Sequence, residues 1–402
     1  MSHPPTSRPA VARGASRLAF DAVEQLTGII EAMHANIAAA PLPLGEGTDG
    51  RTRGVTGFVY DSVRFVNAAA RATLDRGLGL LSSGSGPALP QPRSDALLSA
   101  LNGVLGDHLA ASQNPLAIPM QLRRDGETLP LERAALAAAL PVASGKLLVL
   151  VHGLCMNDRR WDRNGHDHGA ALARDLGHTP VYLLYNSGRH VSENGREFAV
   201  LLEALVGAWP EPVDELVILA HSMGGLVARS ACHQGARAGH AWVGRLRKLV
   251  FLGTPHHGAP LERGGSWLEM LLGVSPYSAP LARLGMLRSA GITDLRYGNV
   301  RDEDWRDRDR FERDGDRRAA APLPAGVACY ALAAALGRRD RHPSSRLLGD
   351  GLVPLDSALG RHAEPARTLA FPEPHCWIGQ GMNHFDLLDH TEVYARLREW
   401  LG

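Results

Sequence analysis

The chain has 402 residues, of which 45% are hydrophobic and 21% are charged, and its formal net charge is +1 at pH 7. This composition is that of a folded globular protein and excludes the disordered class, while the near-zero charge gives no support for nucleic-acid binding. Residues 1–16 contain no apolar run of the secretory type, and no stretch is long enough to span a bilayer. A soluble, cytoplasmic protein is therefore expected.

The N-terminal part of the chain is predicted to be helical over residues 15–112. Apolar residues recur there at spacings of three and four, from Leu18 to Ile37, from Val55 to Leu74 and from Leu97 to Leu109. Apolar stripes of this kind usually face a core, so we expect these helices to dock on the rest of the chain. A separate small bundle and peripheral contact with a membrane are the open alternatives.

From about residue 115 the pattern changes to short extended runs. The pair Asp125-Gly126 predicts a β-hairpin between two such runs. Continuous apolar runs then alternate with helical patterns, which predicts a mostly parallel sheet covered by helices on both faces. The predicted strands are 146–151, 180–185, 216–220, 248–252, 327–334 and 367–371.

A candidate nucleophile lies where the predicted strand 216–220 meets a helix. The sequence Ala220-His221-Ser222-Met223-Gly224 places a serine between small residues at a sharp strand-to-helix turn. Such a turn presents the hydroxyl above the sheet, and its flanking residues must be small because the strand and helix backbones nearly touch. The usual pattern is G-x-S-x-G, and this chain has Ala220 at the first small position.

Two backbone amides are predicted to stabilise an oxyanion beside Ser222. A tetrahedral intermediate needs preorganised N–H donors, and Met223 supplies one at the start of the helix. The loop after strand 146–151 reads His152-Gly153-Leu154, where the glycine lets the Leu154 amide turn inward.

The base and its orienting acid are predicted in two glycine-rich loops. His384 precedes the last predicted helix, and Asp350 lies in a loop after strand 327–334. A serine hydroxyl becomes a useful nucleophile when an imidazole takes its proton, and a carboxylate fixes the tautomer of that imidazole. Asp356, Asp386 and Asp389 compete with Asp350 for the acid role. Asp386 and Asp389 are too near His384 in sequence to be the usual partner.

These segments resemble an α/β-hydrolase of the lipase and esterase type, in particular bacterial triacylglycerol lipases and the lipase-like domain of GPI inositol-deacylases. The order serine, aspartate, histidine along the chain matches that fold. The resemblance implies an α/β-hydrolase domain over 115–402 with a cap insertion at about 259–320, and it leaves residues 1–114 as an unplaced N-terminal helical region. The five segments that carry it are 151–154, 220–225, 252–258, 349–354 and 383–385.

The cap would be apolar and would lie over the active site, and ordinary burial of its apolar residues against the core is the open alternative. Residues 264–287 follow strand 248–252 directly, and apolar insertions at that point often line a pocket. A lipophilic acyl group would then be the preferred substrate. The candidate substrate-binding residues are Trp267, Leu268, Leu271 and Leu272.

Several other residues invite a functional interpretation that we do not favour. His221 is expected to pack under the turn, and Cys155 is expected to be a small packed residue. His256 and His257 lack a clustered carboxylate, so no metal is predicted. The four cysteines form no CxxC pair, so neither a disulfide framework nor a zinc site is expected. The polar residues of 186–194 border the substrate entrance or simply hold their loop.

The leading hypothesis is a serine carboxylester hydrolase with the triad Ser222, Asp350 and His384, acting on a small-molecule or lipid ester without metal or cofactor. An acyltransferase that uses the same acyl-enzyme is the first alternative. A non-catalytic binding protein on the same scaffold is the second. The sequence does not indicate the oligomeric state.

Overall fold

The computed structural model describes residues 8–39, 91–259, 289–309, 315–337 and 349–402, together with part of 61–75. The chain separates into two compact units: residues 1–94 with 109–117, and residues 95–108 with 118–402. Helix α3 (Gln91–Ala111) contributes residues to both units. The predicted division at residue 114 stays a prediction.

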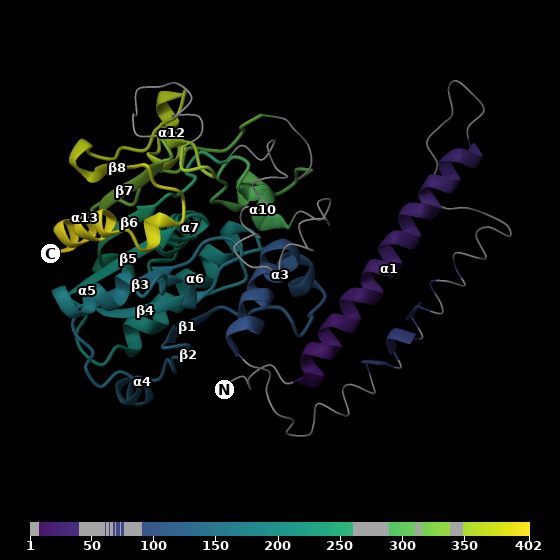
Figure 1. Cartoon of the computed structure of the whole chain (residues 1–402), viewed down its shortest axis with the longest axis horizontal. Helices are drawn as coiled ribbons and strands as arrows, with labels where there is room; N and C mark the ends of the chain where they lie inside the picture. The colour runs from purple at the N-terminus through teal and green to yellow at the C-terminus, as the bar shows by residue number, and fades with distance from the viewer. Residues whose placement is uncertain are drawn as a thin grey trace. The chain divides into compact units, whose positions relative to one another are not determined.

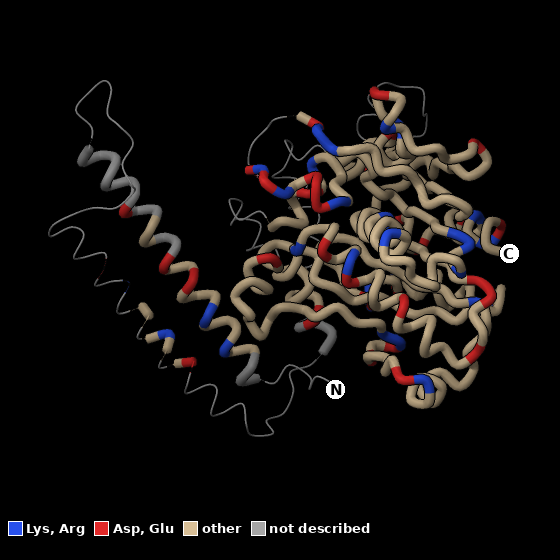
Figure 2. Tube along the Cα trace, turned by 180° about the vertical axis from the view of Figure 1, so that it is seen from behind, with Lys and Arg blue, Asp and Glu red and all other residues tan. Residues whose placement is uncertain are grey.

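The first unit contains α1 (Arg8–Ala39), and the described residues between 61 and 75 are also helical. Ion pairs join these two stretches. Asp75 accepts from Arg13 at 2.8 Å and from Arg17 at 2.5 Å, and the ion pairs Arg71–Asp21 and Arg64–Glu31 continue the series. Figure 2 shows the basic residues grouped toward the start of α1 and the acidic residues further along it.

Burial on α1 differs from the predicted apolar stripe. Ala22 of that stripe is exposed, whereas Asp21, Thr27 and Glu31 are buried. The physical reason is the ion pairing, because carboxylates that are held by arginines can be buried where an unpaired one could not. A polar face of α1 is therefore buried within its unit.

The second unit is built on one eight-stranded sheet (Figure 1). Its strand order is β2-β1-β4-β3-β5-β6-β7-β8, and the strands from β4 to β8 are parallel to one another. The hairpin β1–β2 is antiparallel and continues the sheet beside β4. The strands are β1 (Gln121–Arg124), β2 (Glu127–Thr128), β3 (Lys146–Val151), β4 (Thr179–Leu184), β5 (Glu215–His221), β6 (Leu246–Leu252), β7 (Ala328–Ala335) and β8 (Cys376–Gln380).

Helices cover both faces of this sheet because its strands are apolar on both sides. Alternate residues of a strand point to opposite faces. Leu147 and Val149 of β3 belong to one core cluster, and Leu148 and Leu150 belong to the other. The first cluster includes residues of α4, α6, α7 and α12, and the second includes residues of α5 and α13. The helices are α4 (Arg133–Ala139), α5 (His168–Leu176), α6 (Val191–Ala208), α7 (Met223–Ala238), α10 (Ala290–Asp294), α12 (Leu355–Ala358) and α13 (Thr391–Leu401).

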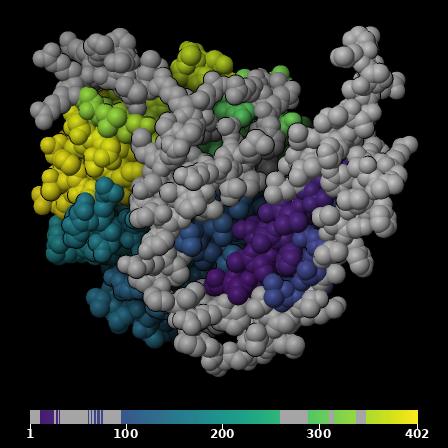
Figure 3. All heavy atoms as spheres, turned by 45° about the vertical axis from the view of Figure 1, so that its right-hand side comes forward, coloured from purple at the N-terminus to yellow at the C-terminus, as the bar shows by residue number. Residues whose placement is uncertain are grey.

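The C-terminal helix α13 packs beside α5, and the space-filling view shows the yellow C-terminal residues against the teal segment that contains α5 (Figure 3). The prediction of a mostly parallel sheet with helices on both faces is confirmed. Five of the six predicted central strands and the Asp125-Gly126 hairpin are present, with ends that shift by at most two residues.

The predicted strand 367–371 is wrong. Leu369 donates its amide to the carbonyl of Gly360 at 2.8 Å, and Phe371 packs edge-on against Phe251, so the apolar residues fill the core without joining the sheet. Pro372 follows and has no amide to give to a strand ladder. The eighth strand is β8, whose sequence CWIGQ has no apolar periodicity that would reveal it.

No helix in the described part of the chain combines the length and apolar character that a membrane crossing requires. Over the described residues of the second unit, Lys and Arg are interspersed with Asp and Glu (Figure 2).

Deletion of residues 1–112 is expected to destabilise the remaining chain. It removes Ala100, Val104 and Leu105 of α3, which are buried, and which lie in the part of α3 that belongs to the second unit. Each fully buried aliphatic side chain contributes about 1.5–3 kcal/mol. We expect lower soluble yield and a lower midpoint of thermal unfolding, measured by differential scanning calorimetry. A truncated protein that is soluble, monomeric and equally stable would contradict this.

Candidate active site

The chain turns sharply between β5 and α7 at Ser222. Its backbone angles are φ 55° and ψ −128°, a region that L-residues rarely adopt. The Ser222 amide donates to the carbonyl of Leu252 at 2.8 Å, so the β5–β6 ladder continues into the turn. His221 and Met223 are fully buried, whereas Ser222 is partly exposed. Its hydroxyl is therefore carried at the tip of a strained strand-to-helix turn.

Glycine at position 224 lets α7 approach the end of β3. A Cβ at Gly224 would lie 2.5 Å from the carbonyl oxygen of His152 and 2.6 Å from that of Val151. At the next position, a Cβ on Gly225 would overlap the side chain of Thr254. The first turn of α7 therefore packs backbone to backbone on the sheet, as the small flanking residues predicted.

The loop His152-Gly153-Leu154 follows β3 and touches the serine turn. A Cβ on Gly153 would lie 3.0 Å from Ser222 Cβ and 3.2 Å from His221 Nδ1. Leu154 is buried in this loop. Met223 begins α7, so its amide is among the first-turn donors that have no acceptor within the helix. Met223 thus follows Ser222 directly, and Leu154 follows the glycine that touches the serine turn.

His152 holds this loop in place. Its Nδ1 lies 2.8 Å from the Gly153 carbonyl oxygen, and its own carbonyl accepts from the Tyr185 hydroxyl at 2.9 Å. The two rings are stacked with centroids 4.3 Å apart. Burial lowers the pKa of His152 to about 4, so the imidazole is neutral at pH 7. A neutral ring in this position supports the loop and carries no charge toward Ser222.

His384 and Asp350 form a buried pair. His384 Nδ1 lies 2.7 Å from Asp350 Oδ2, and both side chains are almost fully buried. The other carboxylate oxygen accepts the amides of Leu352 at 3.0 Å and Val353 at 2.8 Å. The backbone amide of His384 also donates to the Asp350 carbonyl at 3.2 Å. These contacts fix the imidazole with its Nδ1 toward the carboxylate, so that Nε2 is the ring nitrogen that faces away from Asp350.

A glycine that the sequence analysis did not single out makes room for this imidazole. Gly253 follows β6 with φ 59°, and a Cβ there would lie 3.0 Å from both Cε1 and Nδ1 of His384. The His384 carbonyl lies 3.2 Å from His221 Nε2, and the two rings are 4.7 Å apart. His384 is therefore at the carboxyl end of β6, next to the end of β5 that carries Ser222. A glycine directly after a buried strand was the available signal.

The competing carboxylates have other partners. Asp356 is half-exposed and pairs with Arg361 at 3.6 Å. Asp386 accepts the amide of Asn383 at 2.8 Å, and Asp389 pairs with Arg163 at 3.1 Å. Among these candidate acids, Asp350 is the one that contacts the His384 ring.

Cys155 and His221 have environments that suit packing. Burial raises the pKa of the Cys155 thiol to about 12, so the thiolate needed for nucleophilic attack is scarce at neutral pH. Burial also lowers the pKa of His221 well below its ordinary value, so that this ring is neutral.

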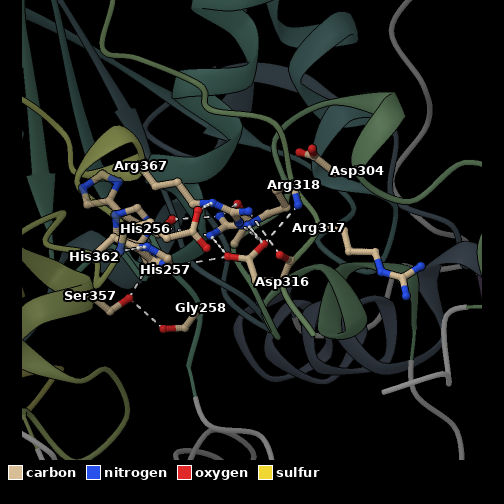
Figure 4. A network of polar contacts seen from close by, with 12 residues as sticks. His256, His257, Gly258, Asp304, Asp316, Arg317, Arg318, Ser357, His362 and Arg367 are labelled. Atoms are coloured by element: carbon tan, nitrogen blue, oxygen red, sulfur yellow. Dashed lines mark hydrogen bonds and ion pairs between the residues drawn. The ribbon is translucent and has the colours of Figure 1, made fainter. Parts of the chain in front are cut away.

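His256 and His257 lie in the loop after β6. They form polar contacts with residues of α12 and its following loop and of the 315–318 segment (Figure 4). His257 Nε2 lies 3.0 Å from the Gly360 carbonyl, and Arg318 donates to the His256 carbonyl at 3.2 Å. Asp316 pairs with Arg318 at 2.7 Å and with Arg367 at 2.8 Å. In the described part of the chain, no three His, Cys, Asp or Glu side chains gather as metal ligands.

The polar residues after β4 hold their loop. Asn186 Nδ2 donates to the Gly106 carbonyl at 2.8 Å, and Asn194 Nδ2 donates to the Asn186 carbonyl at 2.9 Å. His190 lies 3.1 Å from Asp294 and stacks on Trp305. The predicted substrate residues Trp267, Leu268, Leu271 and Leu272 lie outside the described residues, as does most of the predicted cap.

The variant Gly224→Ala is expected to lose about 3 kcal/mol of unfolding free energy, because its methyl group would press on two backbone carbonyls. The matched control is Gly207→Ala in α6, where a Cβ would meet nothing within 4 Å. That control is expected to gain up to about 1 kcal/mol. Urea unfolding of the two variants provides the measurement, and equal midpoints would refute the close approach.

Comparison with known proteins gives one family match. Residues 201–309 match the family model of the PGAP1-like alpha/beta domain, a segment that includes Ser222 but ends before Asp350 and His384. This is less than half of the chain. No curated protein sequence matches the chain.

Solved structures match the chain at low identity and low TM-score. The mature lipase BlEst2 of Bacillus licheniformis is 18% identical with a TM-score of 0.41, and the match covers 64% of this chain and 92% of that one. The esterase Pf2001 of Pyrococcus furiosus is 14% identical with a TM-score of 0.38, covering 65% and 81%. The phospholipase PlaB of Legionella pneumophila is 15% identical with a TM-score of 0.33, covering 53% and 44%. At these scores no activity is carried over from them.

The sheet order, the strained serine turn and the loops at the strand ends are the features of an α/β-hydrolase fold. The chain thus has an α/β-hydrolase fold and resembles lipases and esterases.

Proposed function

We propose that the protein is a serine carboxylester hydrolase that works through an acyl-enzyme. The observation that carries the proposal is the 2.7 Å contact between His384 Nδ1 and Asp350 Oδ2. This pair lies beyond the carboxyl ends of the strands, where β5 ends and Ser222 follows. Ester cleavage by serine requires a nucleophile, a base that takes its proton and an acid that orients the base.

In the proposed first step, Ser222 Oγ attacks the ester carbonyl while His384 Nε2 takes the hydroxyl proton. Asp350 keeps Nδ1–H of the imidazole directed at itself and stabilises the imidazolium that forms. The amides of Leu154 and Met223 hold the oxyanion of the tetrahedral intermediate. Collapse of that intermediate breaks the ester C–O bond, and His384 returns the proton to the departing alcohol.

In the second step, water replaces the alcohol. His384 takes a proton from the water, the hydroxide attacks the acyl carbonyl on Ser222, and the carboxylic acid leaves as Ser222 regains its proton. The steps need no cofactor or metal. Trp267, Leu268, Leu271 and Leu272 are proposed to line an apolar acyl site, which makes a lipophilic ester the preferred substrate.

The variant Ser222→Ala is expected to remove turnover of p-nitrophenyl esters that range from acetate to palmitate. Asp350→Asn is expected to lower kcat by roughly 10³–10⁴-fold, since the imidazole loses the partner that fixes its tautomer. The matched control is Asp356→Asn, because Asp356 pairs with Arg361 and is half-exposed. That control is expected to keep the rate of the unaltered protein.

The outcomes separate the alternatives. A chain-length optimum at long acyl groups would support the lipophilic site, and an optimum at acetate would overturn it. Acylation of Ser222 without release, detected by intact mass spectrometry, would replace the hydrolase with an acyltransferase. A protein whose Ser222 is never acylated by any of these esters would contradict the proposal and favour the non-catalytic scaffold.

A further inference from the structure

The loop after β3, residues 152–157, is called the oxyanion loop here for its proposed role, and it contains a strained residue next to Leu154. Cys155 has φ 59°, a left-handed conformation that a non-glycine residue keeps only when its surroundings enforce it. Its amide donates to Ser187 Oγ at 3.1 Å, which supplies one restraint from the loop after β4. The remaining restraint comes from α3.

Helix α3 packs directly on this loop. A Cβ on Gly103 would overlap Cys155 Sγ and lie 3.0 Å from the Cα and amide nitrogen of Cys155. One turn earlier, Ser99 Oγ accepts from Asn157 Nδ2 at 3.1 Å. Glycine inside a helix is unfavourable relative to alanine, so its presence here matches the need for close backbone approach.

The same turn of α3 holds two further segments at the active-site edge. The Gly106 carbonyl accepts from Asn186 in the loop after β4, and a Cβ on Gly106 would overlap the Asn186 side chain. The Gly103 carbonyl accepts from Ser289 Oγ at 2.6 Å, and Asp107 accepts the Ala290 amide at 3.0 Å.

Residues 103–107 of α3 are also linked to the second proposed oxyanion residue, Met223, through their contacts with α10. Ser289 caps α10, and a Cβ on Gly291 in that helix would lie 3.0 Å from Met223 Cε. Residues 103–107 of α3 therefore contact segments that adjoin both Leu154 and Met223. All of these contacts lie within the second unit.

We propose that α3 is a positioning element of the active site, in which Gly103 sets the place of the oxyanion loop through Cys155. The inference rests on the proposed ester hydrolysis. Oxyanion donors act only at hydrogen-bonding distance from the developing charge, and loss of one such donor typically lowers kcat by about 10²–10³-fold. A small displacement of the loop is therefore expected to lower kcat while KM for a short ester stays nearly constant.

The test uses Gly103→Ala in the full-length protein, with Gly207→Ala as the matched helical control. Rates on p-nitrophenyl acetate are normalised to the active sites counted by fluorophosphonate titration. We expect kcat to fall by about 10–100-fold with KM within about twofold. The inhibition constant of a trifluoromethyl ketone, which forms an oxyanion on serine, is expected to rise by the same factor as kcat/KM falls.

A second substitution tests the contact itself. Cys155→Gly removes the overlapping sulfur and suits the left-handed backbone, so Gly103→Ala combined with Cys155→Gly is expected to recover about tenfold or more of the lost kcat. Ser289→Ala adds no bulk and removes the hydrogen bond from Ser289 Oγ to the Gly103 carbonyl. This variant keeps the inference testable if Gly103→Ala does not fold. That variant is expected to lower kcat by about three- to tenfold, less than loss of a whole oxyanion donor.

The inference is overturned if normalised kcat and the ketone constant in Gly103→Ala equal those of the unaltered protein, even with a lower unfolding temperature. It is also overturned if Gly103→Ala does not fold and Ser289→Ala turns over normally. An unaltered protein without Ser222-dependent turnover refutes the proposed function, and this inference with it. If the unaltered protein turns over through Ser222 and Gly103→Ala is fully active, the proposed function stands and only this inference is refuted.

Discussion

The site depends on how closely α7 approaches the end of β3. Because Gly224 has no side chain, the first turn of α7 rests on the carbonyls of Val151 and His152. That approach leaves so little chain between β5 and α7 that Ser222 alone must make the reversal, with a positive φ. The strain is sustained by the surrounding packing, since His221 and Met223 are fully buried on either side. Ser222 is left partly exposed by this geometry.

The other groups reach the same edge because parallel strands end together. β3 leads into the loop His152-Gly153-Leu154, β5 leads into Ser222, and the segments after β7 and β8 lead into Asp350 and His384. The three histidines near this end of the sheet are all buried, and they differ in their partners. His152 and His221 are neutral and structural, whereas His384 has a carboxylate at its Nδ1. His384 is thereby the ring that contacts a carboxylate, while His152 and His221 contact backbone carbonyls.

The sequence predicted those features that depend on local chemistry. Continuous apolar runs revealed five central strands, and the small residues around Ser222 revealed the turn. The choice of Asp350 over Asp356 agrees with the observed contact to His384, although its catalytic role stays a prediction. Strand β8 was not predicted because its sequence CWIGQ has no distinctive pattern. The apolar run 367–371 was predicted as a strand, but it packs in the core without pairing in the sheet.

The periodicity of apolar residues could not predict features that depend on partners far away in the sequence. The burial of Asp21 and Glu31 requires arginines some 30 to 50 positions away. Apolar spacing in α3 indicated a buried helix, but not that Gly103 would pack on the loop beside Leu154. The place of Gly253 against His384 likewise arises only when two strand ends meet. Such contacts are properties of the tertiary arrangement.

The most direct test of the account is to locate the adduct of a fluorophosphonate on the intact protein by peptide mass spectrometry. The account predicts one adduct, on the peptide that contains Ser222, which forms at least about 10³-fold more slowly when His384 is changed to Ala because the hydroxyl then lacks its base. An adduct on another residue, or labelling of Ser222 at an undiminished rate in His384→Ala, would contradict the proposed triad.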